Sequence, residues 1–212
     1  MPGGSSRVPA GPRGADSARQ PTLTERARRR QLVAVTIGLV AEHGYAACSL
    51  QRIADAAGIT KGAVIYHFAS KNAVIRAAYD AVIEALTERV GTAVGLAPGP
   101  AAAVDAYVES MIGHMAENPT HVRVLTEALA PAVDTGVDDG PASPERRRVL
   151  ADLVTAAVSA GEYRADLDAA TLAVILNGAI DAVVAQTLAD PGYDLTAATA
   201  AVLDMLHRTT AP

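Results

Sequence analysis

Two glycines interrupt a region whose apolar residues otherwise repeat with a helical period. Gly58 and Gly62 both lie in the segment GITKGAVIYHF. Glycine costs about 1 kcal/mol relative to alanine in a helix interior, so one continuous helix through both positions is disfavoured. Gly58 can instead take the positive φ that ends a helix and reverses the chain. The segment therefore predicts two short helices, over residues 49–57 and 61–67, that cross over a tight turn as a helix-turn-helix.

Capping residues support these limits. A Ser or Thr at the start of a helix can accept a hydrogen bond from a backbone N–H of the first turn. Candidate caps in this region are Thr24, Ser49, Thr60 and Ser70. The first and the last of them predict longer helices, over residues 25–43 with a stop at Gly44, and over residues 71–94.

The remainder of the chain also has a helical period. No stretch alternates apolar and polar residues in the manner of a strand, and no internal repeat stands out. Breaks rich in Pro, Gly, Asn and Asp divide the remaining pattern. The predicted helices are 101–117, 120–130, 144–160, 168–189 and 194–208. The sequence therefore predicts an all-α fold.

Charge is distributed unevenly along the 212 residues. Residues 1–78 hold eleven Lys or Arg against four acidic residues, whereas residues 79–212 hold seven against nineteen. A basic end on an acidic remainder is typical of a nucleic-acid-binding head joined to a body that does not contact phosphate.

The first residues differ in composition from the rest. Residues 1–22 are rich in Gly, Pro, Ser and Arg and contain no apolar core of a signal peptide, which predicts a disordered basic tail. No uninterrupted run of 18 apolar residues is present, so we expect no membrane partner and a cytoplasmic location. The single Cys48 excludes an internal disulfide framework and a cysteine-rich zinc site.

The stretch SLQRIADAAGITKGAVIYHFASKNAVI resembles the DNA-binding domain of the TetR family of bacterial transcriptional regulators. The resemblance extends over residues 24–78. It implies a three-helix helix-turn-helix domain at residues 23–70, followed at residues 71–212 by a helical bundle for ligand binding and dimerisation. Two positions depart from the family pattern. Ile65 stands where a DNA-contacting Tyr is usual, and Ala63 where Thr or Ser is common.

The resemblance also implies a function. Such regulators bind a pseudo-palindromic operator in double-stranded DNA as homodimers, and most are repressors that a small-molecule effector releases. An activator and a ligand-independent DNA-binding protein remain alternatives.

Candidate DNA contacts follow from the position of the second short helix. Lys61 can donate to the guanine edge in the major groove, Gly62 permits a close backbone approach, and Lys71 is a candidate phosphate anchor. The full predicted set is Arg28, Ser49, Gln51, Arg52, Thr60, Lys61, Gly62, Ala63, Tyr66, His67 and Lys71.

Two apolar stripes near the C-terminus predict the dimer contact. On two consecutive helices they would make a four-helix bundle with a second copy, as the family implies, although packing within one protomer is the alternative. The predicted residues are Leu172, Ile175, Leu176, Ala179, Ile180, Val183, Thr199, Val202 and Leu206.

Polar residues among the body helices are candidates for effector contacts. Asn177 and Asp181 lie four apart in an apolar helix, where polar side chains need partners; a hydrogen-bonded pair in the dimer interface is the alternative. Tyr107, His114, His121 and Arg123 complete the set. With one Phe and no Trp in the chain, we expect an aliphatic pocket for a moderately apolar effector.

A helical-bundle enzyme is the alternative from another functional class. Cys48 could then act as a nucleophile, or the five histidines could surround a metal. His114 and His121 lack the i, i+4 spacing of a helical metal pair, and no histidine near Cys48 has an evident role as its base. We therefore expect no enzymatic activity, no catalytic residue, no metal and no cofactor.

Overall fold

Helices supply all of the regular secondary structure in the described residues. The computed structural model describes residues 22–129 and 144–212, and within these ranges it contains no strand. The helices are α1 (Leu23–Ala47), α2 (Leu50–Ala57), α3 (Lys61–His67), α4 (Lys71–Gly95), α5 (Pro100–Glu117), α6 (Pro119–Ala128), α7 (Pro144–Ser159), α8 (Ala169–Ala189) and α9 (Leu195–Thr210). The predicted all-α fold is confirmed. Apart from Thr22, the predicted tail lies outside the described residues.

The start of α1 differs from the prediction. Its cap is Thr22 rather than Thr24: the Thr22 hydroxyl accepts a hydrogen bond from Glu25 N at 3.2 Å, and the Glu25 carboxylate accepts one from Thr22 N at 2.6 Å. This reciprocal capping box needs an acidic or amide side chain three residues after the cap. Thr24 has Ala27 at that position, whereas Thr22 has Glu25.

Gly44 interrupts α1 as predicted, but the chain continues through a kink. Its φ of +76° and ψ of 169° are non-helical, and a further short turn runs to Ala47. A residue with a side chain rarely adopts this φ, so glycine is required here.

The two short helices agree with the sequence. Ser49, Thr60 and Ser70 cap α2, α3 and α4, each accepting a backbone N–H at 3.1–3.2 Å. Gly58 is left-handed, with φ 66° and ψ 33°, which lets α3 turn back over α2. The helix-turn-helix is therefore formed as predicted.

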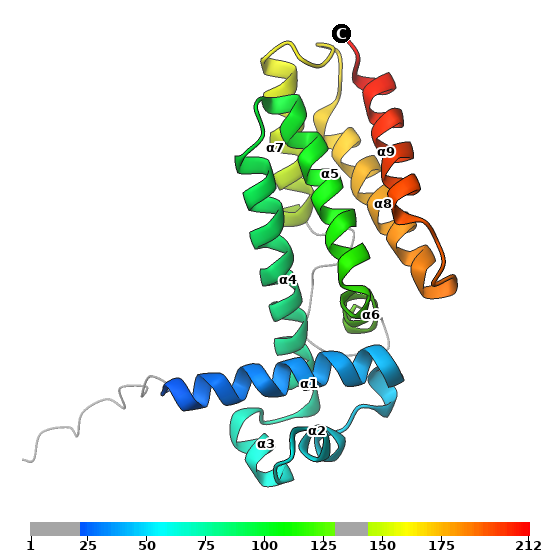
Figure 1. Ribbon diagram of the computed structural model, residues 1–212. Coiled ribbons are helices and arrows are strands. Elements are labelled where there is room, and N and C mark those ends of the chain that lie inside the picture. The colour runs from blue at the N-terminus through cyan, green and yellow to red at the C-terminus, as the bar shows by residue number, and fades with distance from the viewer. Residues whose placement is uncertain (1–21, 130–143) are drawn as a thin grey trace, which may run out of the picture.

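Two hydrophobic clusters lie under the helices. The head cluster joins α1, α2 and α3, and it also takes in the first half of α4 and, from α6, Val124 and Ala128. The body cluster joins the rest of α4 with α5, α7, α8 and α9. Figure 1 shows α4 rising from α1 into the body, with α6 at the level where head and body meet. The long helix α4 thus contributes to both clusters.

Helix α8 is unusually apolar. An 18-residue window of it has a mean hydropathy of 1.7, so by length and composition alone it could cross a membrane, as some core helices of soluble proteins could. Only 28% of that window is buried within the protomer. A large part of this apolar helix is therefore exposed or only partly buried in the protomer.

Candidate nucleic-acid interface

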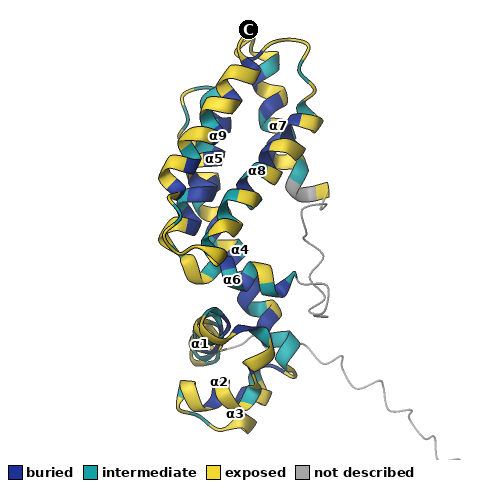
Figure 2. Ribbon diagram, turned by 90° about the vertical axis from the view of Figure 1, so that its right-hand side faces the viewer, coloured by how far each residue is buried: buried dark blue, intermediate teal, exposed yellow. Residues whose placement is uncertain are grey.

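The outward side of α3 is available for contact with DNA. Val64 and Phe68 hold its inner side in the head cluster, which leaves Lys61, Gly62 and Tyr66 exposed. In Figure 2, α2 and α3 lie at one end of the molecule and carry long exposed stretches. The structure therefore presents these three predicted DNA contacts together on one exposed surface.

The predicted residues of α2 lie on the same exposed end and have local partners. Ser49 is engaged as the cap, and Gln51 Nε2 donates to Asp55 Oδ1 at 2.7 Å. Arg52 Nη1 donates to the carbonyl of Ala47 at 3.1 Å, across the junction between α1 and α2. These contacts leave the side chains at the surface, next to α3. Among the predicted α3 residues, Ala63 is half-buried and gives its N–H to the Thr60 hydroxyl.

Two aromatic rings form the C-terminal part of the α3 surface. Tyr66 is 72% exposed and donates from its hydroxyl to Glu25 Oε1 at 2.9 Å. The His67 ring lies edge-on to the Tyr66 ring, with centroids 5.0 Å apart. Glu25 therefore connects the capped start of α1 to the exposed face of α3.

Four arginines lie close together in α1, Arg26, Arg28, Arg29 and Arg30, and they contribute structure as well as charge. Arg29 donates to the carbonyl of His67 and lies 4.1 Å from the centroid of the Phe68 ring. It therefore holds α1 to the end of α3, a role that the sequence reasoning did not find. Arg28, the predicted DNA contact, is half-buried and donates to Gln31 Oε1 at 2.6 Å.

Lys71 lies on an aromatic platform. Its Nζ is 3.7 Å from the centroid of the Tyr45 ring, and the Tyr45 hydroxyl donates to Asn72 Oδ1 at 2.6 Å. A cation over an aromatic face is attracted to the ring quadrupole. Tyr45 therefore fixes the first turn of α4 from the far side of the Gly44 kink. No helical periodicity signals this, because the kink changes the direction of the chain before Tyr45.

Four of the predicted effector residues form two pairs in the body. The buried Tyr107 hydroxyl and Asn177 Oδ1 are 3.4 Å apart, joining α5 to α8, and Asp181 follows one turn later. Asn177 Nδ2 is buried without a hydrogen-bond partner among the described residues. A buried donor without an acceptor costs about 1–3 kcal/mol.

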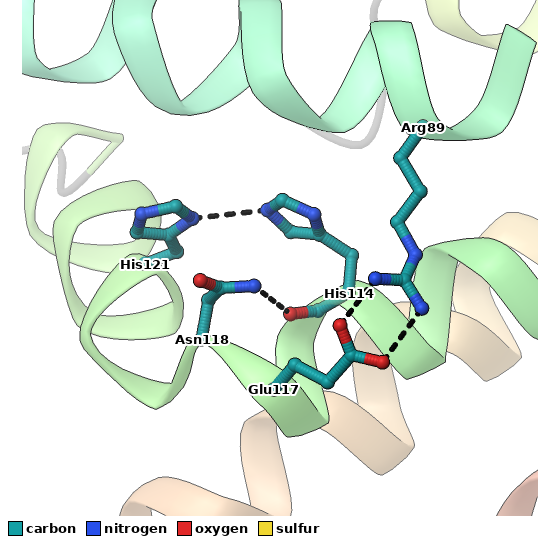
Figure 3. Close-up of polar contacts among 5 residues, drawn as sticks. All are labelled: Arg89, His114, Glu117, Asn118 and His121. Atoms are coloured by element: carbon teal, nitrogen blue, oxygen red, sulfur yellow. Dashed lines mark hydrogen bonds and ion pairs between the residues drawn. The ribbon is translucent and has the colours of Figure 1, made fainter. Parts of the chain in front are cut away.

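The second pair joins α5 to α6. His114 Nε2 and His121 Nδ1 are 3.0 Å apart, and Asn118 Nδ2 donates to the carbonyl of His114 at 2.9 Å (Figure 3). Beside them, Arg89 of α4 binds the Glu117 carboxylate. Burial, with the positive charge of Arg89 added, lowers the pKa of His114, and burial together with His114 lowers the pKa of His121.

These lowered pKa values predict that acid weakens the fold. Because the unfolded chain binds protons on these histidines at a higher pH than the folded chain, their contribution is complete above about pH 6.5 and is lost as pH falls towards the folded pKa values. A loss of about 1 kcal/mol lowers Tm by about 2–4 °C in a protein of this size. Tm should therefore fall between pH 8 and pH 5 more steeply in the wild type than in a His114→Gln/His121→Gln variant. Parallel curves would contradict this origin.

Two surface hollows lie outside these pairs. One of about 340 Å³ is lined by Arg123, Thr126, Glu127 and Leu188, and one of about 450 Å³ lies between α1 and α4. Of the predicted effector residues, only Arg123 lines the first hollow, and none lines the second.

The residues predicted for dimerisation divide into two groups. Five of them pack inside the protomer: Leu172, Leu176, Ile180, Val202 and Leu206. Ile175 is half exposed, and Ala179, Val183 and Thr199 are partly buried. The structure adds Val174 on α8 and Met205 on α9 as exposed apolar side chains, which the sequence reasoning missed.

The residues considered for enzyme chemistry are not assembled into a site. Cys48 is buried in the head cluster, and burial raises the pKa of its thiol, although Lys71 and Arg52 act in the opposite direction. A raised pKa disfavours the nucleophilic thiolate. Within residues 22–129 and 144–212, no three His, Cys, Asp or Glu side chains lie together as a metal site would need.

Comparison with known proteins concerns first the helix-turn-helix. Residues 32–78 match the model of a family described as bacterial regulatory proteins, tetR family. The match includes the second half of α1, all of α2 and α3, and the first turns of α4. No curated protein matches the chain.

Solved structures extend the similarity to the whole fold. The fatty acid degradation regulator FadR from Bacillus halodurans has a TM-score of 0.75 and 20% identity, over 84% of this chain and 94% of its own. FadR from Bacillus subtilis, solved in complex with stearoyl-CoA, has a TM-score of 0.74 and 20% identity, over 84% of this chain and 96% of its own. A TetR transcription regulator from Haloarcula marismortui has a TM-score of 0.77 and 22% identity, over 87% of this chain and 99% of its own. The arrangement of head and body is thus shared with regulators of very different sequence.

Proposed function

Because the chain is a transcriptional regulator of the TetR family, we propose that it binds a pseudo-palindromic operator as a homodimer and represses transcription until a small-molecule effector releases it. The observation that carries the proposal is the exposed face of α3, where Lys61, Gly62 and Tyr66 lie on a helix that is fixed from behind by Val64 and Phe68. This role places the protein in the cytoplasm and assigns it no catalytic activity.

Dimerisation is supported by the apolar side of α8. A single helix-turn-helix reads few bases, and dimers place two of them about one turn of DNA apart, ~34 Å, or a multiple of it. The exposed side chains of Val174 and Ile175, with Met205 of α9, offer an apolar surface for the same surface of a second copy. Apolar groups left in water at such a surface gain about 25 cal/mol for each Å² that a second copy covers.

The side chains inside the body support one class of effector. The body cluster is mainly aliphatic, and the amide of Asn177 offers one donor for a polar group. We propose an effector with an aliphatic body and one or two polar groups. The similar FadR of Bacillus subtilis carries stearoyl-CoA in its crystal structure, which makes fatty acids and acyl-CoA esters the first panel for thermal-stabilisation screening. A compound that raises Tm by binding the body and also lowers operator affinity supports release. Stabilisation without release favours the ligand-independent alternative, and tighter operator binding favours an activator.

The test of DNA binding uses the purified full-length protein. Wild-type protein should select a pseudo-palindromic sequence from a random double-stranded library and bind it as a dimer or as two dimers. Affinity should fall steeply with salt, because basic side chains displace counterions from phosphate. Failure to select any sequence would overturn the proposal.

Two lysine substitutions separate base reading from phosphate binding. Lys61→Ala should relax the selected sequence, since a good base contact is worth about 1–3 kcal/mol of discrimination. Lys71→Ala should weaken binding to all duplexes alike and reduce the salt slope by about 2 for the dimer, from one lost phosphate contact in each protomer. Wild-type affinity and slope in both variants would show that α3 is not the recognition helix.

A further inference from the structure

The kink at Gly44 leaves two backbone groups to be satisfied from outside α1. In an uninterrupted helix, the N–H of Tyr45 would donate to the carbonyl of Ala41. Here α6 supplies a partner for each of these groups: Arg123 Nη1 donates to Ala41 O at 3.1 Å, and Glu127 Oε2 accepts from Tyr45 N at 3.1 Å. Arg123 Nε and Glu127 Oε1 are also 3.6 Å apart, so the two side chains act as one ionic bridge.

The bridge lies closely against the kink. A Cβ on Gly44 would lie 3.0 Å from Glu127 Oε1 and 3.3 Å from Arg123 Nη2. The glycine therefore serves two purposes, since it takes a φ of +76° and admits the bridge to the backbone. A displacement of α6 along α1 beyond the reach of these two side chains would break the hydrogen bonds.

Tyr45 connects the bridge to the DNA-facing surface. Its N–H is held by Glu127, its ring lies under Lys71 Nζ, and its hydroxyl donates to Asn72. The same residue therefore contacts α6 through its backbone and the first turn of α4 through its side chain. Lys71 is the phosphate anchor of the proposed function, so its place depends on Tyr45.

Helix α6 is also held to the body. His121 meets His114 of α5 at 3.0 Å, and Leu125 packs against both hydrophobic clusters. The segment between His121 and Glu127 thus connects the body to the kink over less than two turns of helix.

We infer that Arg123 and Glu127 are positioning residues for DNA binding: by bridging the kink of α1 they hold Tyr45, and through Tyr45 they hold Lys71 in place to contact phosphate. This inference rests on the proposed function. It assigns to α6, beside α4, the task of setting the phosphate contacts of the head from the body.

The test compares Glu127→Ala with Glu127→Gln in the full-length protein. The alanine removes the acceptor of the Tyr45 N–H, whereas the glutamine keeps an acceptor oxygen and serves as the matched control. Binding is measured over a series of salt concentrations, on the duplex that the wild type selects and on a duplex of unrelated sequence. Glu127→Ala should lower affinity on both duplexes and reduce the salt slope by about 2, as Lys71→Ala does. Glu127→Gln should restore most of the slope.

A double-mutant cycle separates positioning from a general loss of structure. In a Lys71→Ala background, Glu127→Ala should reduce affinity and slope no further, because the phosphate contact that it positions is already absent. Additive effects, or a lower Tm with an unchanged salt slope, would overturn the inference.

A second route is available if Glu127→Ala does not fold. Tyr45→Leu removes the ring under Lys71 and keeps the backbone contact with Glu127, so it should reproduce the change of slope. Tyr45→Phe, which keeps the ring, should retain more of the wild-type salt slope. A wild-type slope in Tyr45→Leu would contradict the inference. A wild type that selects no duplex would instead refute the proposed function.

Discussion

Ile175→Glu should convert the protein to a monomer and remove operator binding at concentrations where the wild type is fully bound. Ile175 is 50% exposed and its neighbour Val174 49%, on a helix whose mean hydropathy is 1.7. In the proposed dimer this side chain lies against the second copy. A carboxylate buried there without a partner costs on the order of 3 kcal/mol, and two-fold symmetry places it in the interface twice. The dimer dissociation constant should therefore rise at least about a thousandfold.

The measurement is sedimentation or light scattering over a range of concentrations, together with operator titration. Val149→Glu is the matched control, because Val149 of α7 is also apolar and 50% exposed. The control should remain dimeric with the affinity of the wild type. A dimeric Ile175→Glu variant with normal operator affinity would mean that α8 does not form the interface.

Gly62→Leu should raise the thermal stability of the protein and weaken its binding to DNA. A Cβ at this position has only the Thr60 hydroxyl within 4 Å, at 3.8 Å, so the fold has room for a side chain. Leucine is a far better helix former than glycine, by up to about 1 kcal/mol, and Tm should rise by about 2–4 °C. On DNA, the same side chain would stand between the recognition helix and the bases. Operator affinity should fall about a hundredfold or more, from base contacts worth about 1–3 kcal/mol lost in each half-site.

Gly91→Leu is the control for this prediction. Gly91 is an exposed helical glycine of α4 with nothing within 4 Å of an added Cβ, and it belongs to the half of α4 that packs in the body. It should gain similar stability and bind the operator normally. If Gly62→Leu also bound normally, a close approach of the α3 backbone to DNA would be excluded.

The helix-turn-helix was predictable because its signals are local. Ser49, Thr60 and Ser70 each cap the helix that immediately follows, and Gly58 takes the left-handed conformation that its position suggested. Such features depend on the backbone groups of one turn, so no knowledge of the rest of the fold is needed. The resemblance of this segment to a known family added the expectation that the helical body binds a ligand and forms a dimer.

The packing of the body was not predictable at the same level. Helix α8 is apolar on nearly all sides, so periodicity could not tell that Leu176 faces the body cluster while Val174 and Ile175 face outward. The contact of His114 with His121 depends on the turn at Asn118, which sets how α6 leaves α5. Likewise, the bridge between α6 and the kink of α1 joins residues about eighty positions apart in sequence, Ala41 with Arg123 and Tyr45 with Glu127.

The composition of the head cluster limits which segments of this chain could be exchanged with those of a similar protein. Val124 and Ala128 of α6, and α4 residues as far as Val82, belong to the same cluster as the helix-turn-helix. A hybrid gene that joined only residues 22–70 to a foreign sensor would therefore leave apolar surface of α1 uncovered. An exchange of the helix-turn-helix between two such proteins should give a folded product only if α6, or a helix with matching side chains, is transferred with it. The helix-turn-helix and the α6 residues that cover it lie about fifty positions apart in the sequence, and they have to be inherited together.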